Sequence, residues 1–90
     1  MPAPREPYLH FVVRKDLTWR QRACQLIHAM DAWAAEHGAH DGPILVFGVR
    51  DQDELVEYVS DDAVVFREPH YDNAPTALAR RSRPDGLRLA

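Results

Sequence analysis

Three short runs of β-branched and aromatic residues, separated by stretches with helical spacing, constrain the fold of this 90-residue chain most strongly. The runs at 8–13, 44–49 and 63–67 are typical of buried strands, because such side chains pack well on a pleated sheet. The second run is apolar on both faces, which predicts a central strand of a parallel sheet. A shorter run at 76–79 predicts a fourth strand.

Two helices are predicted between these strands. Thr18 precedes Gln21 by three residues, which is the spacing of a capping box, and Gly38 provides a stop. Asp51 and Glu54 repeat the capping pattern before a second, shorter helix. In the first helix, apolar side chains recur every three or four residues and predict the buried face, namely Ala23, Leu26, Ile27, Met30, Trp33 and Ala34.

The element order β-α-β-α-β-β predicts a single-domain α/β fold, with helices packed on a small, mostly parallel (mixed) four-stranded sheet. The domain is expected at 8–80, after a flexible N-terminus at 1–7 and before a flexible, arginine-rich tail at 81–90. Two helices barely cover both faces of such a sheet, and a chain of this size buries only about 60–65% of its unfolded surface. We therefore expect a homodimer that hides the remaining apolar surface.

The composition predicts a soluble protein in a reducing compartment. The lone Cys24 excludes an internal disulfide, and no apolar run reaches the ~18–20 residues that span a bilayer. We therefore expect a cytoplasmic protein with no membrane partner. The net charge of −3 is uneven, with six acids and one arginine at 44–66 but five arginines and three acids at 67–90. This pattern argues against general coating of nucleic acid and leaves open a local phosphate-binding edge.

The sequence contains no clear motif for a nucleophilic catalytic residue or for a metal site. The serines lie in no nucleophile motif, and Cys24 has no base beside it in the sequence to activate it. His37, His40 and Asp41 surround a predicted helix end, but no second ligand cluster has a recognisable spacing. The four glycines are too scattered for a phosphate loop. No metal site or cofactor is therefore expected.

The polar residues that could carry chemistry follow the first and third predicted strands. Arg14, Lys15 and Asp16 come after the first strand, and Arg67 and Glu68 come after the third. Ligands of open α/β sheets collect beyond the carboxyl ends of the parallel strands, so we expect these side chains to share one edge. Ordinary surface ion pairs, which contribute little stability, are the alternative interpretation.

One face of the long predicted helix is polar but almost uncharged. Gln21, Gln25 and His28 lie on the side opposite the stripe of Leu26 and Met30. Amides and an imidazole suit a face that meets a ligand, whereas a solvated face more often carries lysine and glutamate. A solvated face is the alternative interpretation of the spacing.

Two N-terminal motifs resemble the second family of peptidyl-tRNA hydrolases, the archaeal and eukaryotic type, of which this chain would be a compact variant. The sequence V-V-R-K-D-L at 12–17 is similar to the family's V-V-R-x-D-L strand end, and A-C-Q-L-I-H-A at 23–29 is similar to its A-A-Q-x-x-H-A helix. Arg67-Glu68 stands where the family has Arg-Asp-Ala-Gly, and T-A-L-A at 76–79 looks like its last strand. The resemblance extends over residues 8–79.

The resemblance implies hydrolysis of the ester between a peptide, or an amino acid, and the 3′ end of tRNA, with no cofactor. The catalytic residues that it implies are Lys15, Asp16, Glu68, Gln25 and Thr76. The tRNA- or substrate-binding residues that it implies are Arg14, Arg20, Gln21, Arg22, His28 and Arg67, with the tail arginines as further phosphate contacts. Glu68 is the expected carboxylate that orients or deprotonates the attacking water.

The sequence departs from the family pattern in three places. Arg20-Gln21 stands in place of a Gly-Lys pair at the helix entry, Glu68 replaces a loop aspartate, and the closing helix has no equivalent. Because a fold does not fix a function, two alternatives stay open. One is a non-hydrolytic module that binds tRNA or a protein, and the other is a small-molecule enzyme on the same fold.

Overall fold

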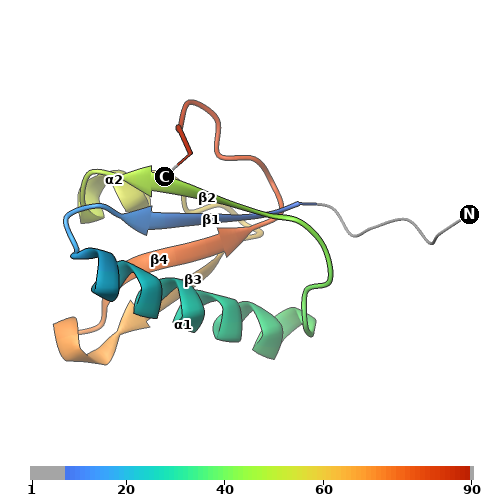
Figure 1. Cartoon of the computed structure of the whole chain (residues 1–90), viewed down its shortest axis with the longest axis horizontal. Helices are drawn as coiled ribbons and strands as arrows, with labels where there is room; N and C mark the ends of the chain where they lie inside the picture. Colours follow the sequence, from blue (N-terminus) through green and yellow to red (C-terminus); the bar gives the residue numbers. More distant parts are fainter. Residues whose placement is uncertain (1–7, 90) are drawn as a thin grey trace, which may run out of the picture.

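The computed structural model describes residues 8–89, which form four strands, two α-helices and one 3-10 turn (Figure 1). The strands are β1 (Leu9–Arg14), β2 (Ile44–Val49), β3 (Val64–Glu68) and β4 (Ala74–Arg80). The helices are α1 (Trp19–His37) and α2 (Gln52–Val56), and the turn is η1 (Pro69–Tyr71). The predicted order β-α-β-α-β-β is confirmed, whereas the predicted flexible segment at 1–7 lies outside the described residues.

The strands form one mixed sheet in the order β2-β1-β4-β3. β1 and β2 pair in parallel, with Leu9 opposite Ile44 and Arg14 opposite Val49, whereas β4 runs antiparallel to both of its neighbours. β1, β2 and β3 therefore point in one direction (Figure 1). Their carboxyl ends lie together along one side of the sheet, which we call its carboxyl edge, as the sequence predicted for the first and third strands. The α/β fold with a mixed sheet is confirmed.

β2 is an edge strand, so the prediction that it is central was wrong. Within residues 8–89, its outer edge meets only an isolated bridge between Phe47 and Leu89. Its apolar sequence has a different cause, because each face of β2 borders apolar groups. Phe47 and Val49 are buried on the α2 side, whereas Ile44, near the α1 side, remains 44% exposed.

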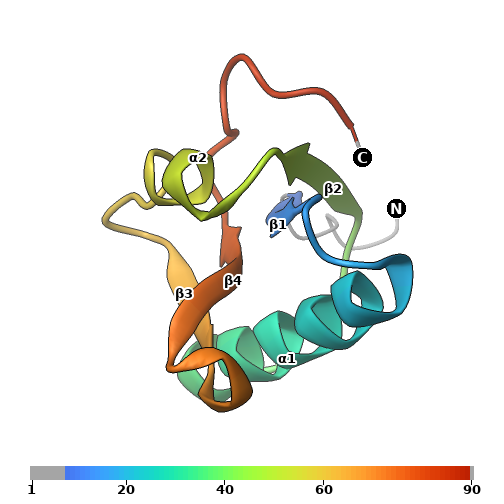
Figure 2. The same cartoon turned by 90° about the vertical axis from the view of Figure 1, so that its left-hand side faces the viewer.

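The two helices cover opposite faces of the sheet (Figure 2). α1 packs on β1, β3 and β4, where Ala29 and Trp33 join the apolar cluster of that face. α2 covers the other face through Leu55, which is fully buried against Val12 and Leu78. Neither helix among residues 8–89 is long and apolar enough to cross a membrane.

α1 begins and ends where the sequence predicts. Thr18 Oγ1 accepts a hydrogen bond from the Gln21 backbone N–H at 3.2 Å, and Gln21 Oε1 accepts one from the Thr18 N–H at 2.9 Å. At the other end, Gly38 has a φ of 81° and donates its N–H to the Ala34 carbonyl at 2.8 Å. A residue without Cβ adopts this positive φ at no steric cost, which explains the helix stop.

The buried face of α1 differs from the predicted apolar stripe. Gln25, Ala29 and Trp33 are the buried residues of α1, whereas Ile27 is 62% exposed and Leu26 lies at the border of the core. The predicted stripe was therefore wrong in part. Helical periodicity identifies the apolar faces of a helix. It does not show which of two adjacent faces packs on the sheet when a polar side chain such as Gln25 has a buried hydrogen-bond partner.

Residues 81–89, where the sequence predicted a flexible tail, fold back over the α2 side of the sheet (Figure 1). Pro84 is fully buried, and Leu87 packs against the apolar cluster around Leu55. The burial of these two side chains stabilises the segment by removing apolar area from water.

Asp62 holds the start of this segment in place. Its carboxylate accepts hydrogen bonds from the backbone N–H groups of Arg81 at 3.0 Å and Ser82 at 2.9 Å, and from the hydroxyl groups of Ser60 and Ser82. Desolvation acts to raise the pKa of Asp62, but the hydrogen bonds from Ser60 and Ser82 outweigh it and hold the pKa well below its usual range.

Replacement of Asp62 by asparagine should lower the free energy of unfolding at pH 7 by about 1 kcal/mol, because a neutral amide accepts hydrogen bonds less strongly and the site is partly solvated. This loss corresponds to about 4–8 °C in Tm for a domain of this size. The folded-state pKa of Asp62 is depressed, so the wild-type advantage is present above the unfolded-state pKa of about 3.9 and shrinks as the pH falls below it.

Thermal unfolding of both proteins between pH 7 and pH 3 measures this effect. Asp61→Asn is the matched control, because Asp61 is exposed and accepts no hydrogen bond from a described side chain or backbone group. An Asp62→Asn difference that is as large at pH 3 as at pH 7 would contradict the assignment.

Candidate active site

A pocket of about 380 Å³ opens where the first half of α1 meets the end of β3 and η1. It lies at the carboxyl edge of the sheet, where the sequence placed the site. Its lining residues are Arg20, Gln21, Cys24, Gln25, His28, Glu68, His70 and Tyr71. The fold therefore brings together five of the predicted site residues, namely Arg20, Gln21, Gln25, His28 and Glu68.

Glu68 is the buried acid of this pocket. It is the last residue of β3 and is only 6% exposed, yet its carboxylate accepts no hydrogen bond from any of residues 8–89. Its backbone carbonyl accepts a hydrogen bond from the Asn73 N–H at 2.9 Å, which holds the following turn. Because no described group engages this carboxylate, it remains available as a hydrogen-bond or proton acceptor for a molecule in the pocket.

Thr76 supports the pocket from the sheet. The register between β3 and β4 shifts between Phe66 and Arg67, which leaves Thr76 as the extra residue of a β-bulge. The fully buried Thr76 hydroxyl donates a hydrogen bond to Gln25 Oε1 at 2.6 Å. This bond fixes the Gln25 amide, whose nitrogen then remains as a donor at the pocket wall.

The remaining wall is aromatic and polar. His28 stacks on Phe66, with ring centroids 4.8 Å apart and planes inclined by 21°. His70 and Tyr71 come from η1, and Cys24 lies one turn before His28. These last three residues were missed. Sequence spacing does not show that His70 and Tyr71 of the β3–β4 connection turn toward α1. Cys24, in contrast, has the helical spacing of Gln21 and His28 and could have been found from it.

Arg14 and Asp16 form an ion pair and do not line the pocket. Arg14 donates to both Asp16 oxygens, from Nε at 3.0 Å and from Nη2 at 2.7 Å. Its Nη1 also donates to the Pro75 carbonyl at 3.2 Å, which joins the end of β1 to the start of β4. The hydrogen bond between the two side chains lowers the pKa of Asp16 and raises the pKa of Arg14.

Three other predicted site residues lie outside the pocket. Lys15 extends across Gly48 of β2, toward a different part of the surface. Arg22 donates from Nε to a carbonyl of the β1–α1 connection at 3.1 Å, and Arg67 donates to a carbonyl of the β3–β4 connection at 3.5 Å. Arg20 is therefore the one predicted cation that the described structure places in the pocket wall.

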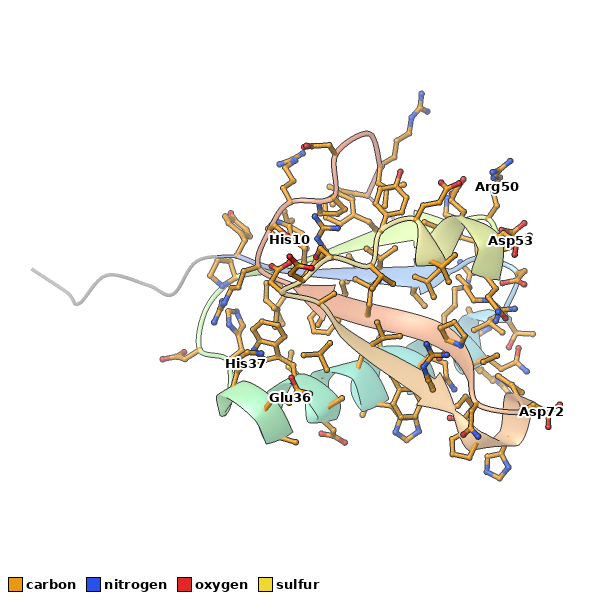
Figure 3. All side chains as sticks on the ribbon, turned by 180° about the vertical axis from the view of Figure 1, so that it is seen from behind. His10, Glu36, His37, Arg50, Asp53 and Asp72 are labelled. Atoms are coloured by element: carbon orange, nitrogen blue, oxygen red, sulfur yellow. The ribbon has the colours of Figure 1, made fainter. Side chains whose placement is uncertain are left out.

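The labelled side chains of Figure 3 mark the two ends of the sheet. Arg50, Asp53 and Asp72 lie at the carboxyl edge, whereas His10 and His37 lie at the opposite end. His37 stacks there on the ring of a buried tryptophan, at 4.0 Å between centroids. Within residues 8–89, no three His, Cys, Asp or Glu side chains gather as ligands of a metal ion would.

Replacement of Thr76 by valine should lower the free energy of unfolding by about 1–3 kcal/mol, because it leaves Gln25 Oε1 without its buried donor. Thr76→Ser is the control, since it keeps the hydroxyl and loses one methyl group, worth about 0.8 kcal/mol. Urea unfolding compares the three proteins. A valine variant that is at least as stable as the wild type would show that this hydrogen bond does not hold α1 on the sheet.

Comparison of the chain with known protein families and with curated protein sequences gave no match. The resemblance to the peptidyl-tRNA hydrolases therefore stays a prediction.

Proposed function

We propose that the protein hydrolyses the ester bond between a peptide, or an amino acid, and the 3′ end of a tRNA. The observation that carries this proposal is Glu68, a residue only 6% exposed that lines the pocket and whose carboxylate accepts no hydrogen bond from residues 8–89. Ester hydrolysis without a nucleophilic serine needs such a carboxylate to orient or deprotonate the attacking water.

A donor for the developing oxyanion comes from α1. The Gln25 amide lines the same pocket as Glu68, and its orientation is set by the hydrogen bond from Thr76. A donor that is already fixed before the reaction stabilises the transition state without a cost of reorganisation. The pocket therefore combines an acceptor for the water proton with a donor for the carbonyl oxygen.

The surroundings of the pocket suit the 3′ end of an RNA strand. The first turn of α1 has no acid but carries Arg20 and Arg22, although cations are unfavourable at the positive end of a helix dipole. An anionic partner such as a phosphate offsets this cost. The exposed ring of His28 and the ring of Tyr71 offer surfaces on which a base stacks.

One observation favours the alternative of a tRNA-binding module without hydrolysis. Lys15 and Asp16, to which the family resemblance assigns catalytic roles, do not line the pocket. Both functions require tRNA binding, but only the enzyme cleaves the ester. Cleavage of a blocked aminoacyl-tRNA therefore separates the two.

Wild-type protein incubated with an N-acetylated aminoacyl-tRNA should release free tRNA, and Glu68→Gln should reduce turnover by about 10²–10⁴-fold, the usual contribution of a general base. Binding of tRNA should persist or tighten slightly, because the substitution removes a negative charge near the phosphates. Glu68→Asp should keep part of the activity, since it keeps the carboxylate. Glu57→Gln, an exposed glutamate beyond α2, is the matched control.

Hydrolysis by Glu68→Gln at the wild-type rate would show that another group activates the water. If the wild type binds tRNA and leaves the ester intact, the protein is the binding module instead.

We propose further that two copies associate. α1 leaves the sheet uncovered beside β2, where an apolar groove of about 280 Å³ runs between Leu26, Ile27 and Met30 of α1 and Ile44 and Val46 of β2. Residues 8–89 leave this surface open, and Ile27 and Ile44 on it are 62% and 44% exposed. We infer that a second copy of this chain covers the groove, because a two-fold axis placed there buries the same apolar surface on both copies.

Sedimentation at micromolar concentration should give twice the chain mass of 10.3 kDa, and Ile27→Glu should give a 10.3 kDa species. Val59→Glu is the control, because Val59 is also about half exposed but lies after α2, on the other face of the sheet. A wild type that sediments only as the single chain would contradict the dimer.

A further inference from the structure

A second concave site lies at the carboxyl edge, at the β2 end of the sheet. It is a pocket of about 320 Å³ formed by three parts of the chain that are far apart in the sequence, at 15, 48–58 and 86–88. Its charged lining residues are Lys15 from the β1–α1 connection, Arg50 after β2, Glu54 of α2 and Arg88 of the folded-back segment. The tyrosine that follows α2, Tyr58, lines it as well.

The charges of this pocket are unbalanced. Glu54 is already engaged by Arg50, whose Nε donates to Oε2 at 2.8 Å and whose backbone N–H donates to Oε1 at 3.1 Å. Lys15 and Arg88 form no ion pair with any carboxylate of residues 8–89. Three cations and one carboxylate give the pocket a net charge of +2 on a chain whose net charge is −3. A concave surface of this kind attracts an anion.

Gly48 gives Lys15 its position. A Cβ atom at Gly48 would overlap Lys15 Cε, so the lysine side chain crosses β2 only because this residue is a glycine. On the other side of the pocket, Gly86 has a φ of 83°, and the chain that follows it buries Leu87 and brings Arg88 to the pocket. Two glycines thus shape a site in which two cations face the same space.

We propose that this pocket binds a phosphate group, with Lys15 and Arg88 as charged donors. Ammonium and guanidinium groups form strong, charge-assisted hydrogen bonds to phosphate oxygens, and the Tyr58 hydroxyl adds a neutral donor. The site goes beyond the proposed ester hydrolysis and does not depend on it, because none of these groups lines the pocket of Glu68.

The phosphate belongs either to an RNA strand or to a small phosphorylated molecule. β2 and β3 are separated by three strand spacings, about 14 Å, and the two pockets lie on opposite faces of the sheet, one beside α1 and the other beside α2. An RNA strand that crosses the carboxyl edge would reach both. Pyrophosphate and a single-stranded RNA oligonucleotide are therefore the two probes.

Calorimetric titration of the whole chain with pyrophosphate should show binding, and Lys15→Gln and Arg88→Gln should each weaken it about tenfold, the contribution of one charged hydrogen bond. Arg83→Gln is the matched control. It removes the same charge from the same segment, but Arg83 lies over the Phe47 ring, at 6.0 Å from its centroid, and does not line the pocket.

Gly48→Ala tests the position of Lys15 without a change of charge. The new methyl group should displace the lysine and weaken pyrophosphate binding as Lys15→Gln does. The Tm should not fall, because the overlapping atom belongs to a flexible side chain and alanine is favoured over glycine within a strand.

The RNA probe identifies the source of the phosphate. If the ligand is RNA, Lys15→Gln should reduce the slope of log affinity against log salt by about 0.7, the value for one phosphate contact of a single strand. An unchanged slope together with weaker pyrophosphate binding would assign the site to a small phosphorylated molecule.

Glu68→Gln should leave pyrophosphate binding unchanged, so failure of the ester hydrolysis proposal does not remove this one. The phosphate site is overturned if the wild type binds neither probe. It is equally overturned if Arg83→Gln weakens binding as much as Lys15→Gln does, because the effect would then be one of net charge.

Discussion

The hydrogen bond from the Thr76 hydroxyl to the Gln25 amide joins the helix that carries the polar groups of the pocket to the sheet that carries its acid. Because this bond buries a glutamine, it sets the rotation of α1 about its own axis. Trp33 turns toward the sheet, and Ile27 turns away from it beside β2. The same rotation brings Gln25 into the pocket wall with Glu68. This buried polar pair, together with the burial of Ala29 and Trp33 on the same helix face, thus decides where the pocket and the apolar groove lie.

The direction of the strands decides which groups can meet. β1, β2 and β3 end at one edge, and β4 starts there, so the residues that follow three strands are neighbours in space. Arg14 sits in the middle of this edge, where it holds Asp16 and the Pro75 carbonyl. The acid Glu68 lies on the β3 side of this cluster, and the cation Lys15 lies on the β2 side. The edge therefore separates a pocket with an acid in its wall from a pocket with a net positive charge.

The segment 81–89 contributes both to stability and to the second of these sites. The Asp62 carboxylate anchors its start, and Pro84 and Leu87 bury apolar area on the α2 face, where a single short helix leaves the sheet incompletely covered. The positive φ of Gly86 turns the chain so that Arg88 reaches the pocket of Lys15. An arginine-rich composition with a proline and a glycine predicted a flexible tail, because burial of the apolar residues between the arginines depends on the sheet beneath them.

The sequence by itself determined the elements and their order, since strand-forming runs and the capping box of Thr18 and Gln21 act over a few residues. It also determined that the acid at the end of the third strand would lie at the carboxyl edge, where the pocket of Glu68 opens, because parallel strands end together. Only the tertiary structure decided which of the predicted polar residues contribute to the pocket of Glu68 and which lie elsewhere on the surface. The β-bulge turns Thr76 toward α1, and the missing Cβ of Gly48 lets Lys15 cross β2 and leave the predicted site. These two outcomes depend on contacts between residues more than thirty positions apart, which local propensity and spacing do not encode.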